Sequence, residues 1–140
     1  MSLELGALLE PLSVAIHATR RAQLAPAARV LVLGAGAIGL LTAAMARIGG
    51  AIDVVIADVD QGRLDFAVAN DFAHASYTVP LARDGQTLDE ALDFARATAA
   101  AAAAVTGGAV DATAPPEFDA VFECTGVPSC AQTAIYVSFP

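Results

Sequence analysis

Apolar positions along the chain form short runs that alternate with longer stretches of helical spacing. Four runs have the length and composition of strands: 29–33, 53–57, 75–79 and 119–123. After its arginine, the first run is continuously apolar, as is typical of a strand buried on both faces of a parallel sheet. Helices are expected in the stretches that follow the strands, ending near residue 48 and covering 60–69, 86–105 and 128–136. This alternation predicts an α/β fold, a parallel sheet with helices on both faces.

Two helical segments carry further expectations. A helix is expected to start at Pro11, because proline suits a first helical turn and disfavours helical backbone at Glu10 before it. His17 on this helix is expected to be a core histidine with its hydrogen bonds satisfied. Farther along, the six consecutive alanines at 99–104 have high helix propensity but little packing surface. They are therefore expected to lie on a plain surface helix, followed by a loop at 107–116.

Three glycines lie between the first strand and its helix. Gly34, Gly36 and Gly39 have the spacing G-x-G-x-x-G. In a dinucleotide-binding unit the first allows the tight turn, the second lets a pyrophosphate approach the backbone, and the third lets helix and strand pack closely. The N-terminus of the helix then presents N–H groups to the phosphates. The same spacing is compatible with a tight turn that binds nothing, so the glycines alone do not decide the function.

A carboxylate at the end of the second strand favours the cofactor interpretation. Asp58 lies about 20 residues beyond the glycines, where it can accept hydrogen bonds from the hydroxyls of an adenosine ribose. Its charge would repel a 2′-phosphate, which favours NAD over NADP. By itself Asp58 is equally compatible with a helix cap or a solvated strand end. Arg63, in the first turn of the next helix, is either a contact to the adenosine end or a surface arginine.

Composition excludes several function classes. The net charge of −8, with seven arginines and no lysine, argues against binding to nucleic acid. The uncharged stretch 30–46 reaches the lower length limit of a membrane span, but its three glycines argue against one continuous helix. Cys124 and Cys130 form neither a disulfide framework nor a zinc knuckle and are expected to be small, buried and reduced. Because residues 1–9 do not resemble a signal peptide, a cytoplasmic location is expected.

Four segments of the chain resemble one known family. These are LLEPLSVAIHATRRA, VLVLGAGAIGLL, VVIADVDQGRLDFA and FDAVFECTGVPS. They closely resemble the coenzyme domain of NAD-dependent sorbitol and xylitol dehydrogenases, the polyol branch of the zinc-dependent medium-chain dehydrogenases, with the fungal members nearest. The glycine motif is common to many families, whereas E-P-L-S-V followed by I-H-A and later by E-C-T-G is much more specific.

The resemblance implies a role for each matching residue. Ile38 would touch the cofactor, Asp58 and Arg63 would hold its adenosine end, and Glu10 would stand beside the catalytic zinc of an intact enzyme. Cys124, Thr125 and Gly126 would end the fourth strand on the nicotinamide side of the crevice. The cofactor-binding set expected from the motif and the resemblance is Gly34, Gly36, Ala37, Ile38, Gly39, Asp58, Arg63, Cys124, Thr125 and Gly126.

The chain also departs from the pattern of that family. The zinc ligands of such enzymes come from a cysteine and a His-Glu pair in a preceding catalytic domain, and this sequence has neither a His-Glu pair nor a cysteine before Cys124. Residues 1–24 are therefore expected to join a catalytic domain that is absent here, and 25–140 to form an incomplete, partial Rossmann domain without its last strands. An intact relative would form oligomers and oxidise a polyol to a ketose by hydride transfer to NAD. The chain by itself is expected to bind NAD weakly and to transfer no hydride.

Two other interpretations remain open at this level. A non-catalytic NAD-binding module would account for the missing zinc ligands. A methyltransferase that uses S-adenosylmethionine also has a glycine-rich turn and an acidic strand end, but it would not account for the Glu10–Pro11 segment.

Overall fold

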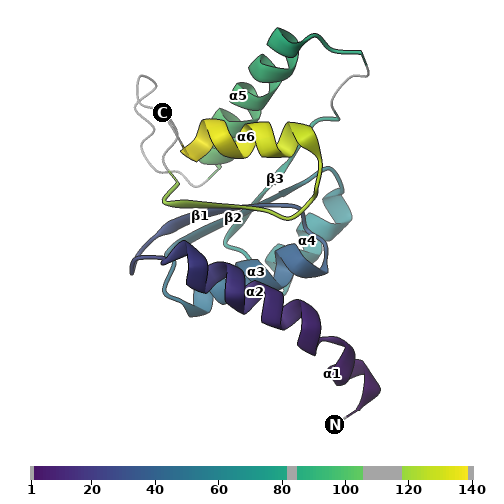
Figure 1. Ribbon diagram of the computed structural model, residues 1–140, viewed down its shortest axis with the longest axis vertical. Coiled ribbons are helices and arrows are strands. Elements are labelled where there is room, and N and C mark those ends of the chain that lie inside the picture. Colours follow the sequence, from purple (N-terminus) through teal and green to yellow (C-terminus); the bar gives the residue numbers. More distant parts are fainter. Residues whose placement is uncertain (1, 82–84, 106–117, 139–140) are drawn as a thin grey trace.

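A four-stranded parallel sheet forms the centre of the protein (Figure 1). The computed structural model describes residues 2–81, 85–105 and 118–138, so the loop expected at 107–116 lies outside the described residues. The strand order is β3-β2-β1-β4. The strands are β1 (Arg29–Leu33), β2 (Asp53–Asp58), β3 (Ala75–Thr78) and β4 (Ala120–Glu123). All four predicted strands are present within one residue of their expected bounds, which confirms the parallel α/β fold.

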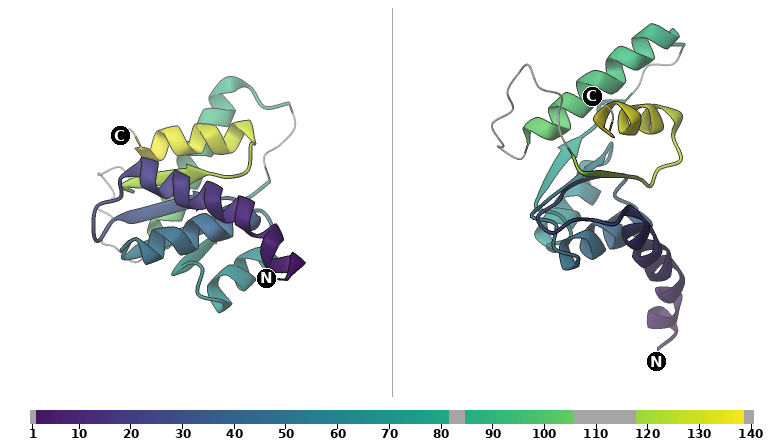
Figure 2. Two further views of the ribbon diagram at one scale, coloured as in Figure 1. Left: turned by 60° about the horizontal axis from the view of Figure 1, so that its bottom comes forward. Right: turned by 60° about the vertical axis from the view of Figure 1, so that its left-hand side comes forward.

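Helices cover both faces of this sheet (Figures 1 and 2). On one face, α3 (Ala37–Ile48) and α4 (Gln61–Ala69) pack on the strands, and α2 (Leu9–Ala22) packs on α3. On the other face, α5 (Leu88–Ala104) and α6 (Pro128–Ser138) pack on each other and on the strands. A short helix, α1 (Leu3–Ala7), continues beyond α2 and points away from the sheet in each view.

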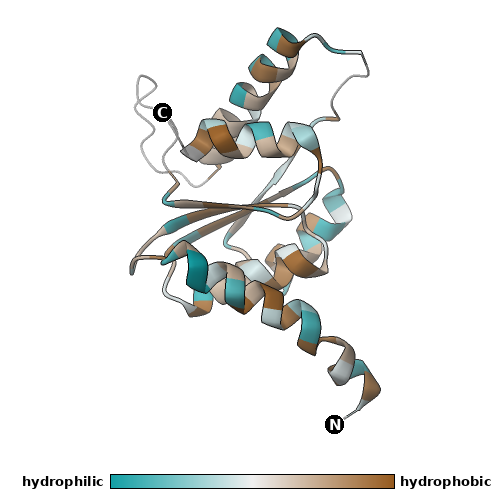
Figure 3. Ribbon diagram, viewed as in Figure 1, coloured by the Kyte–Doolittle hydropathy of each residue, from teal (hydrophilic) through white to brown (hydrophobic). Residues whose placement is uncertain are grey.

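The two inner strands supply the core. Alternate side chains point to opposite faces of a strand, so β1 and β2 contribute to two separate hydrophobic clusters. The side chains toward α3 and α4 are Val30, Val32, Val54 and Ile56. Those toward α5 and α6 are Leu31, Leu33, Val55 and Ala57. Since all eight are at most 1% exposed, burial on both faces explains why the sequence is apolar without alternation (Figure 3).

Helix α3 approaches the sheet through small side chains. Its buried residues are Gly39, Thr42, Ala43 and Ala46. Leu40 also packs against the core cluster on this face, but other large apolar side chains of the helix point elsewhere: Ile48 is 75% exposed, and Met45 lines a groove against Ile16 of α2. The close approach of α3 to β1 therefore depends on the absence of bulk on the helix.

The structure corrects two predictions for the first helix. Helix α2 begins at Leu9, so Glu10 is helical rather than outside the helix. Pro11 is compatible with this start because the first N–H groups of a helix have no partner within it, so a missing one breaks no hydrogen bond. His17 was expected in the core, but it lies exposed on α2. The sequence pattern could not tell that α2 packs on a second helix and leaves this side in solvent.

One side of the alanine run is buried, so the run is not a plain surface segment. Ala99, Ala102 and Ala103 are at most 2% exposed and belong to the cluster on the α5 and α6 side of the sheet. A methyl group suffices as a core side chain where helix and sheet lie close together. The expectation that this helix has little packing surface was therefore wrong.

This packing predicts different effects for two neighbouring substitutions. Ala102→Leu is expected to lower the free energy of unfolding by about 2 kcal/mol, because three extra carbon atoms enter a filled core. Ala104→Leu, on the exposed side of the same helix, is expected to change it by less than about 0.5 kcal/mol. Urea denaturation followed by circular dichroism measures both values. Equal stability of the two variants would contradict the burial of this face.

Candidate functional site

A cleft of about 500 Å³ lies at the carboxyl ends of the strands. After β3 at one edge of the sheet, the chain crosses to the other side of β1 and forms β4 there. The direction in which strands are added therefore reverses beside β1, and ligands of open α/β sheets usually bind at such a point. Its walls come from the glycine turn, the ends of β2 and β3, α5, and the loop that leads from β4 into α6. The lining residues are Leu33, Gly34, Gly36, Ala57, Asp58, Val59, Arg63, Val79, Pro80, Leu81, Phe94, Cys124, Thr125, Val127, Ser129 and Cys130.

Two of the three motif glycines are required by the protein's own packing. Gly34 has φ of +103°, and a Cβ atom there would lie 2.9 Å from Cγ2 of Thr125. A Cβ atom on Gly39 would lie 1.8 Å from the carbonyl oxygen of Gly34, which no side chain can tolerate. These positions hold the start of α3 tightly against the end of β1.

Gly36 is different, because nothing within the described residues requires a glycine there. Its backbone is extended, with φ of −78° and ψ of −176°, a conformation open to any residue. A Cβ atom added at this position would meet no heavy atom within 4 Å. The space beside Gly36 belongs to the cleft. A glycine at this position is therefore explained best by a group from outside the chain that lies against the backbone.

The N-terminus of α3 offers a site for an anion. Gly36 is its N-cap and provides no side-chain hydrogen bond, and the first turn holds no acidic residue. By contrast, side chains of Ser2, Asp60 and Thr87 cap α1, α4 and α5. An uncapped first turn leaves N–H groups and the positive end of the helix dipole available to a phosphate.

Asp58 connects the glycine turn to the end of β2. Its Oδ2 accepts a hydrogen bond from the N–H of Ala35 at 2.6 Å, and its Oδ1 accepts one from the N–H of Asp60 at 2.9 Å. A carboxylate can accept about four hydrogen bonds, so this half-buried group keeps capacity for ligand hydroxyls. Arg63 also lines the cleft, and its Nε lies 3.9 Å from the carboxylate of Asp60, with 59% of the side chain exposed. It is loosely held and able to reach a ligand.

The opposite wall is a short loop after β4. Here the carboxylate of Glu123 accepts hydrogen bonds from the N–H groups of Thr125, at 2.6 Å, and Gly126, at 3.1 Å. It also accepts one from the hydroxyl of Thr125. Gly126 has φ of +72°, a backbone conformation that favours glycine. The loop is thus shaped by one acidic side chain and one glycine.

Both cysteines line the cleft and are half-buried free thiols. They were expected to be small, buried residues, and the structure moves them to the edge of the core. Burial raises the pKa of the Cys124 thiol above its ordinary value. Cys124 is therefore protonated at neutral pH and a poor nucleophile.

Known proteins with similar sequences are dehydrogenases. The chain is 43% identical over 136 residues to L-arabinitol 4-dehydrogenase from Aspergillus oryzae and 39% identical over 135 residues to L-idonate 5-dehydrogenase from Vitis vinifera. These alignments cover 97% and 96% of this chain and 33% and 32% of the two relatives. The chain resembles polyol dehydrogenases. It spans about a third of the length of the curated relatives that it matches, and no protein-family model matches it.

Solved structures of medium-chain dehydrogenases share the fold. A protein from Clostridium scindens, assigned as a zinc-binding dehydrogenase, superimposes with a TM-score of 0.71 at 26% identity, covering 94% of this chain and 31% of that one. A second protein with this assignment, from Sinorhizobium meliloti and bound to NADP, has a TM-score of 0.65 at 25% identity, covering 91% and 32%. The expected resemblance to zinc-dependent polyol dehydrogenases is therefore confirmed.

The structure brings together most of the residues expected from the polyol dehydrogenase resemblance. Those that line the cleft are Gly34, Gly36, Asp58, Arg63, Cys124 and Thr125. Those that neighbour it in the chain without lining it are Ala37, Ile38, Gly39 and Gly126. Glu10 is exposed in the first turn of α2 and does not line the cleft.

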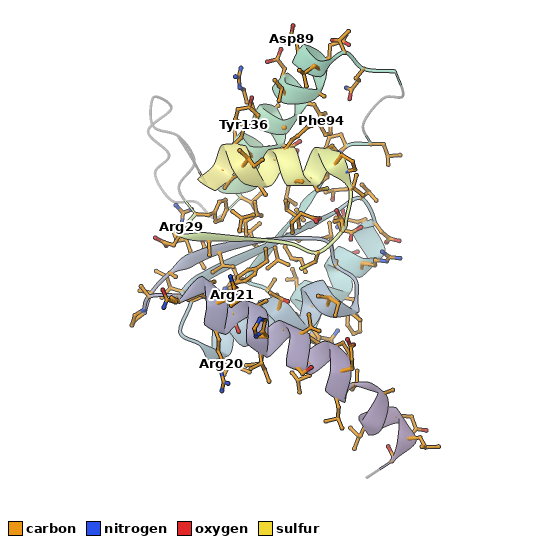
Figure 4. All side chains as sticks on the ribbon, viewed as in Figure 1. Arg20, Arg21, Arg29, Asp89, Phe94 and Tyr136 are labelled. Atoms are coloured by element: carbon orange, nitrogen blue, oxygen red, sulfur yellow. The ribbon has the colours of Figure 1, made fainter. Side chains whose placement is uncertain are left out.

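The apolar part of the cleft was not predicted from the sequence. Val59, Leu81 and Val127 line it although each is at least 46% exposed, and Phe94 reaches it from α5 (Figure 4). The position of Val59 and Leu81 just after strands β2 and β3 could have indicated the first two. No sequence signal indicates Phe94, because its position depends on how α5 crosses the sheet. A cation–π contact helps to fix that crossing: the guanidinium carbon of Arg96 lies 4.9 Å from the ring centre of Tyr136 in α6.

The described residues contain neither a membrane-spanning helix nor a cluster of metal ligands. Each helix in the described part of the chain is too short or too polar to cross a bilayer. Within residues 2–81, 85–105 and 118–138, no three His, Cys, Asp or Glu side chains gather as metal ligands would. These residues therefore do not fit a zinc site.

Proposed function

We propose that this chain is the NAD-binding part of a polyol dehydrogenase of the sorbitol or xylitol type. The observation that carries the proposal is the open space at Gly36. Neither the backbone conformation nor the packing requires a glycine there, and the helix that begins at this position has no side-chain cap. A pyrophosphate lying against that backbone would explain the glycine, because a side chain at this position would keep the phosphates away. The similarity to polyol dehydrogenases supports the same assignment.

Each part of the cofactor has a counterpart in the cleft. The pyrophosphate would lie at Gly36 and the first turn of α3, against the backbone of Ala37 and Ile38. The adenosine ribose would bind the carboxylate of Asp58, with Arg63 beside it, and the nicotinamide side would lie toward Cys124–Gly126. When bound, NAD supplies the hydride acceptor, while these residues bind and orient it. The carboxylate of Asp58 disfavours the 2′-phosphate of NADP by charge repulsion.

The remaining parts of the reaction belong to other residues of a longer protein. We propose that residues 1–24 join the chain to a catalytic domain that holds the zinc, with Glu10 beside it. The exposed leucines of α1 are consistent with a further contact surface, and Leu3 is 92% exposed. In such a protein the oxidised carbon is an alcohol carbon of a polyol, and the product is a ketose. Hydride transfer is not expected from the chain alone.

A titration of the isotope-labelled chain with NAD⁺, followed by NMR, tests the proposal. We expect weak binding, in the millimolar range, with shift changes concentrated at Gly34–Gly39, Asp58 and Thr125. We expect weaker binding of NADP⁺, no response to S-adenosylmethionine, and no NADH when a polyol is added. Absence of shifts at these residues would contradict the cofactor site. Production of NADH would contradict the assignment of catalysis to other residues.

A non-catalytic NAD-binding module is the second candidate. It is favoured by the lack of a metal-ligand cluster in the described part of the chain. Such a module should bind NAD⁺ with micromolar affinity and elute as a stable monomer in size-exclusion chromatography. Weak binding together with aggregation would favour a part of a larger enzyme instead.

A further inference from the structure

The acidic side chain that ends β4 organises a loop without lining the cleft itself. Glu123 is exposed, and its Oε1 accepts the N–H of Thr125 at 2.6 Å, while both of its carboxylate oxygens lie 3.1 Å from the N–H of Gly126. The network extends one residue farther, because Oγ1 of Thr125 accepts the N–H of Val127 at 2.9 Å. One carboxylate thus organises the backbone as far as Val127.

This loop is in direct contact with the glycine turn. Glu123 pairs with Leu33 across the two strands, and the N–H of Cys124 donates to the carbonyl of Leu33 at 2.8 Å. A Cβ atom on Gly34 would lie 2.9 Å from Thr125 and 3.2 Å from the carbonyl oxygen of Cys124. A shift of the loop would therefore move the wall of the cleft that Cys124 and Thr125 form. It would also break the contact between this loop and the glycine turn.

The loop needs such a clamp because it is exposed. Thr125 and Gly126 lie in solvent, where water competes for their N–H groups. An ionised acceptor competes better than a neutral one, because hydrogen bonds to charged groups are roughly twice as strong.

We propose that Glu123 is a positioning residue that holds residues 124–127 as the wall of the cleft opposite Asp58. The inference rests on the proposed NAD site and deepens it. Because Asp58 would bind the adenosine half, the clamped loop serves the other half of the dinucleotide. Loss of the clamp should therefore weaken binding of NAD⁺ more than binding of AMP, which lacks that half.

Three variants of the 140-residue chain separate this role from general stability. Glu123→Ala removes the acceptor, whereas Glu123→Gln keeps one carbonyl oxygen for the N–H of Thr125. Asp119→Ala is the matched control, because Asp119 precedes the other end of β4 and its carboxylate accepts the N–H of Arg29 at 2.7 Å, away from the loop.

We expect Glu123→Ala to speed amide hydrogen exchange at Thr125 and Gly126 about tenfold, the effect of losing a charged hydrogen-bond acceptor. The same variant should weaken NAD⁺ about fivefold in NMR titrations and leave AMP unchanged, with Glu123→Gln between it and the original chain. Asp119→Ala should change neither quantity.

Unchanged exchange at Thr125 and Gly126 would overturn the clamp. Equal weakening of NAD⁺ and AMP, or the same effects from Asp119→Ala, would overturn the positioning role. If the original chain binds neither nucleotide, the proposed NAD site fails and the positioning role fails with it. Exchange rates then still decide, on their own, whether Glu123 orders the loop.

Discussion

Gly39→Ala is expected to lower the free energy of unfolding by about 3 kcal/mol or more, or to prevent folding altogether. The new Cβ atom would lie 1.8 Å from the carbonyl oxygen of Gly34 and 2.9 Å from its carbonyl carbon. Both atoms are backbone at the end of a buried strand, so no change of side-chain rotamer relieves the overlap. Helix α3 would have to move away from β1 and lose the packing of its small residues.

Gly36→Ala is the matched control, three residues earlier in the same turn. Its Cβ atom would meet nothing within 4 Å, so stability should change by less than about 0.5 kcal/mol in urea denaturation. The methyl group would occupy the space proposed for the pyrophosphate, so the NMR response to NAD⁺ should disappear. Equal stability of the two variants would contradict the close approach at Gly39, and unchanged NAD⁺ binding by Gly36→Ala would contradict the cofactor site.

Asp58→Ala is expected to weaken both the fold and the binding of NAD⁺. The N–H of Ala35 would lose its acceptor at a residue that is 2% exposed, which destabilises the chain by about 1–3 kcal/mol. Loss of a charged acceptor for the ribose hydroxyls should weaken NAD⁺ by about 10- to 100-fold. Urea denaturation measures the first effect and NMR titration the second.

Asp58→Asn separates these two effects. The amide oxygen still accepts the N–H of Ala35, whereas the amide nitrogen cannot accept the N–H of Asp60, so the loss of stability should be smaller than in Asp58→Ala. The charge is lost, so NAD⁺ should bind less tightly and its advantage over NADP⁺ should shrink. An undiminished preference for NAD⁺ in this variant would show that Asp58 does not select the cofactor.

Local patterns predicted much of the fold and part of the site. The continuous apolar strands identified a sheet buried on both faces, and the glycine spacing with Asp58 identified the end of the sheet where the cleft lies. These features are readable because each one depends on residues close together in the chain. Turn geometry and the distance from a strand to its following helix are local properties.

The prediction failed where the answer depended on which surfaces meet. Ala99, Ala102 and Ala103 of α5 are core residues, while His17, which was expected in the core, is exposed. Helical spacing shows that a helix has two faces, but the distance to the sheet decides whether a methyl group or a larger side chain fits between them. Phe94 and the Glu123 loop contribute to the cleft for a similar reason, since their partners are far away in the sequence.

The order of strands and helices, the glycine turn and the acidic residue that follows it could be predicted from the sequence, because these depend on short-range backbone geometry. The contacts between distant segments were needed to show that Gly34 and Gly39 serve packing while Gly36 faces open space. The same contacts place Thr125, which follows β4, directly against the glycine turn, which follows β1. These two strands are far apart in the sequence: the hydrogen bond between Arg29 and Asp119 joins residues 90 positions apart. The physical reason is steric: whether a glycine serves the fold or a ligand depends on which atoms stand within 4 Å of its missing side chain, and those atoms come from other parts of the chain.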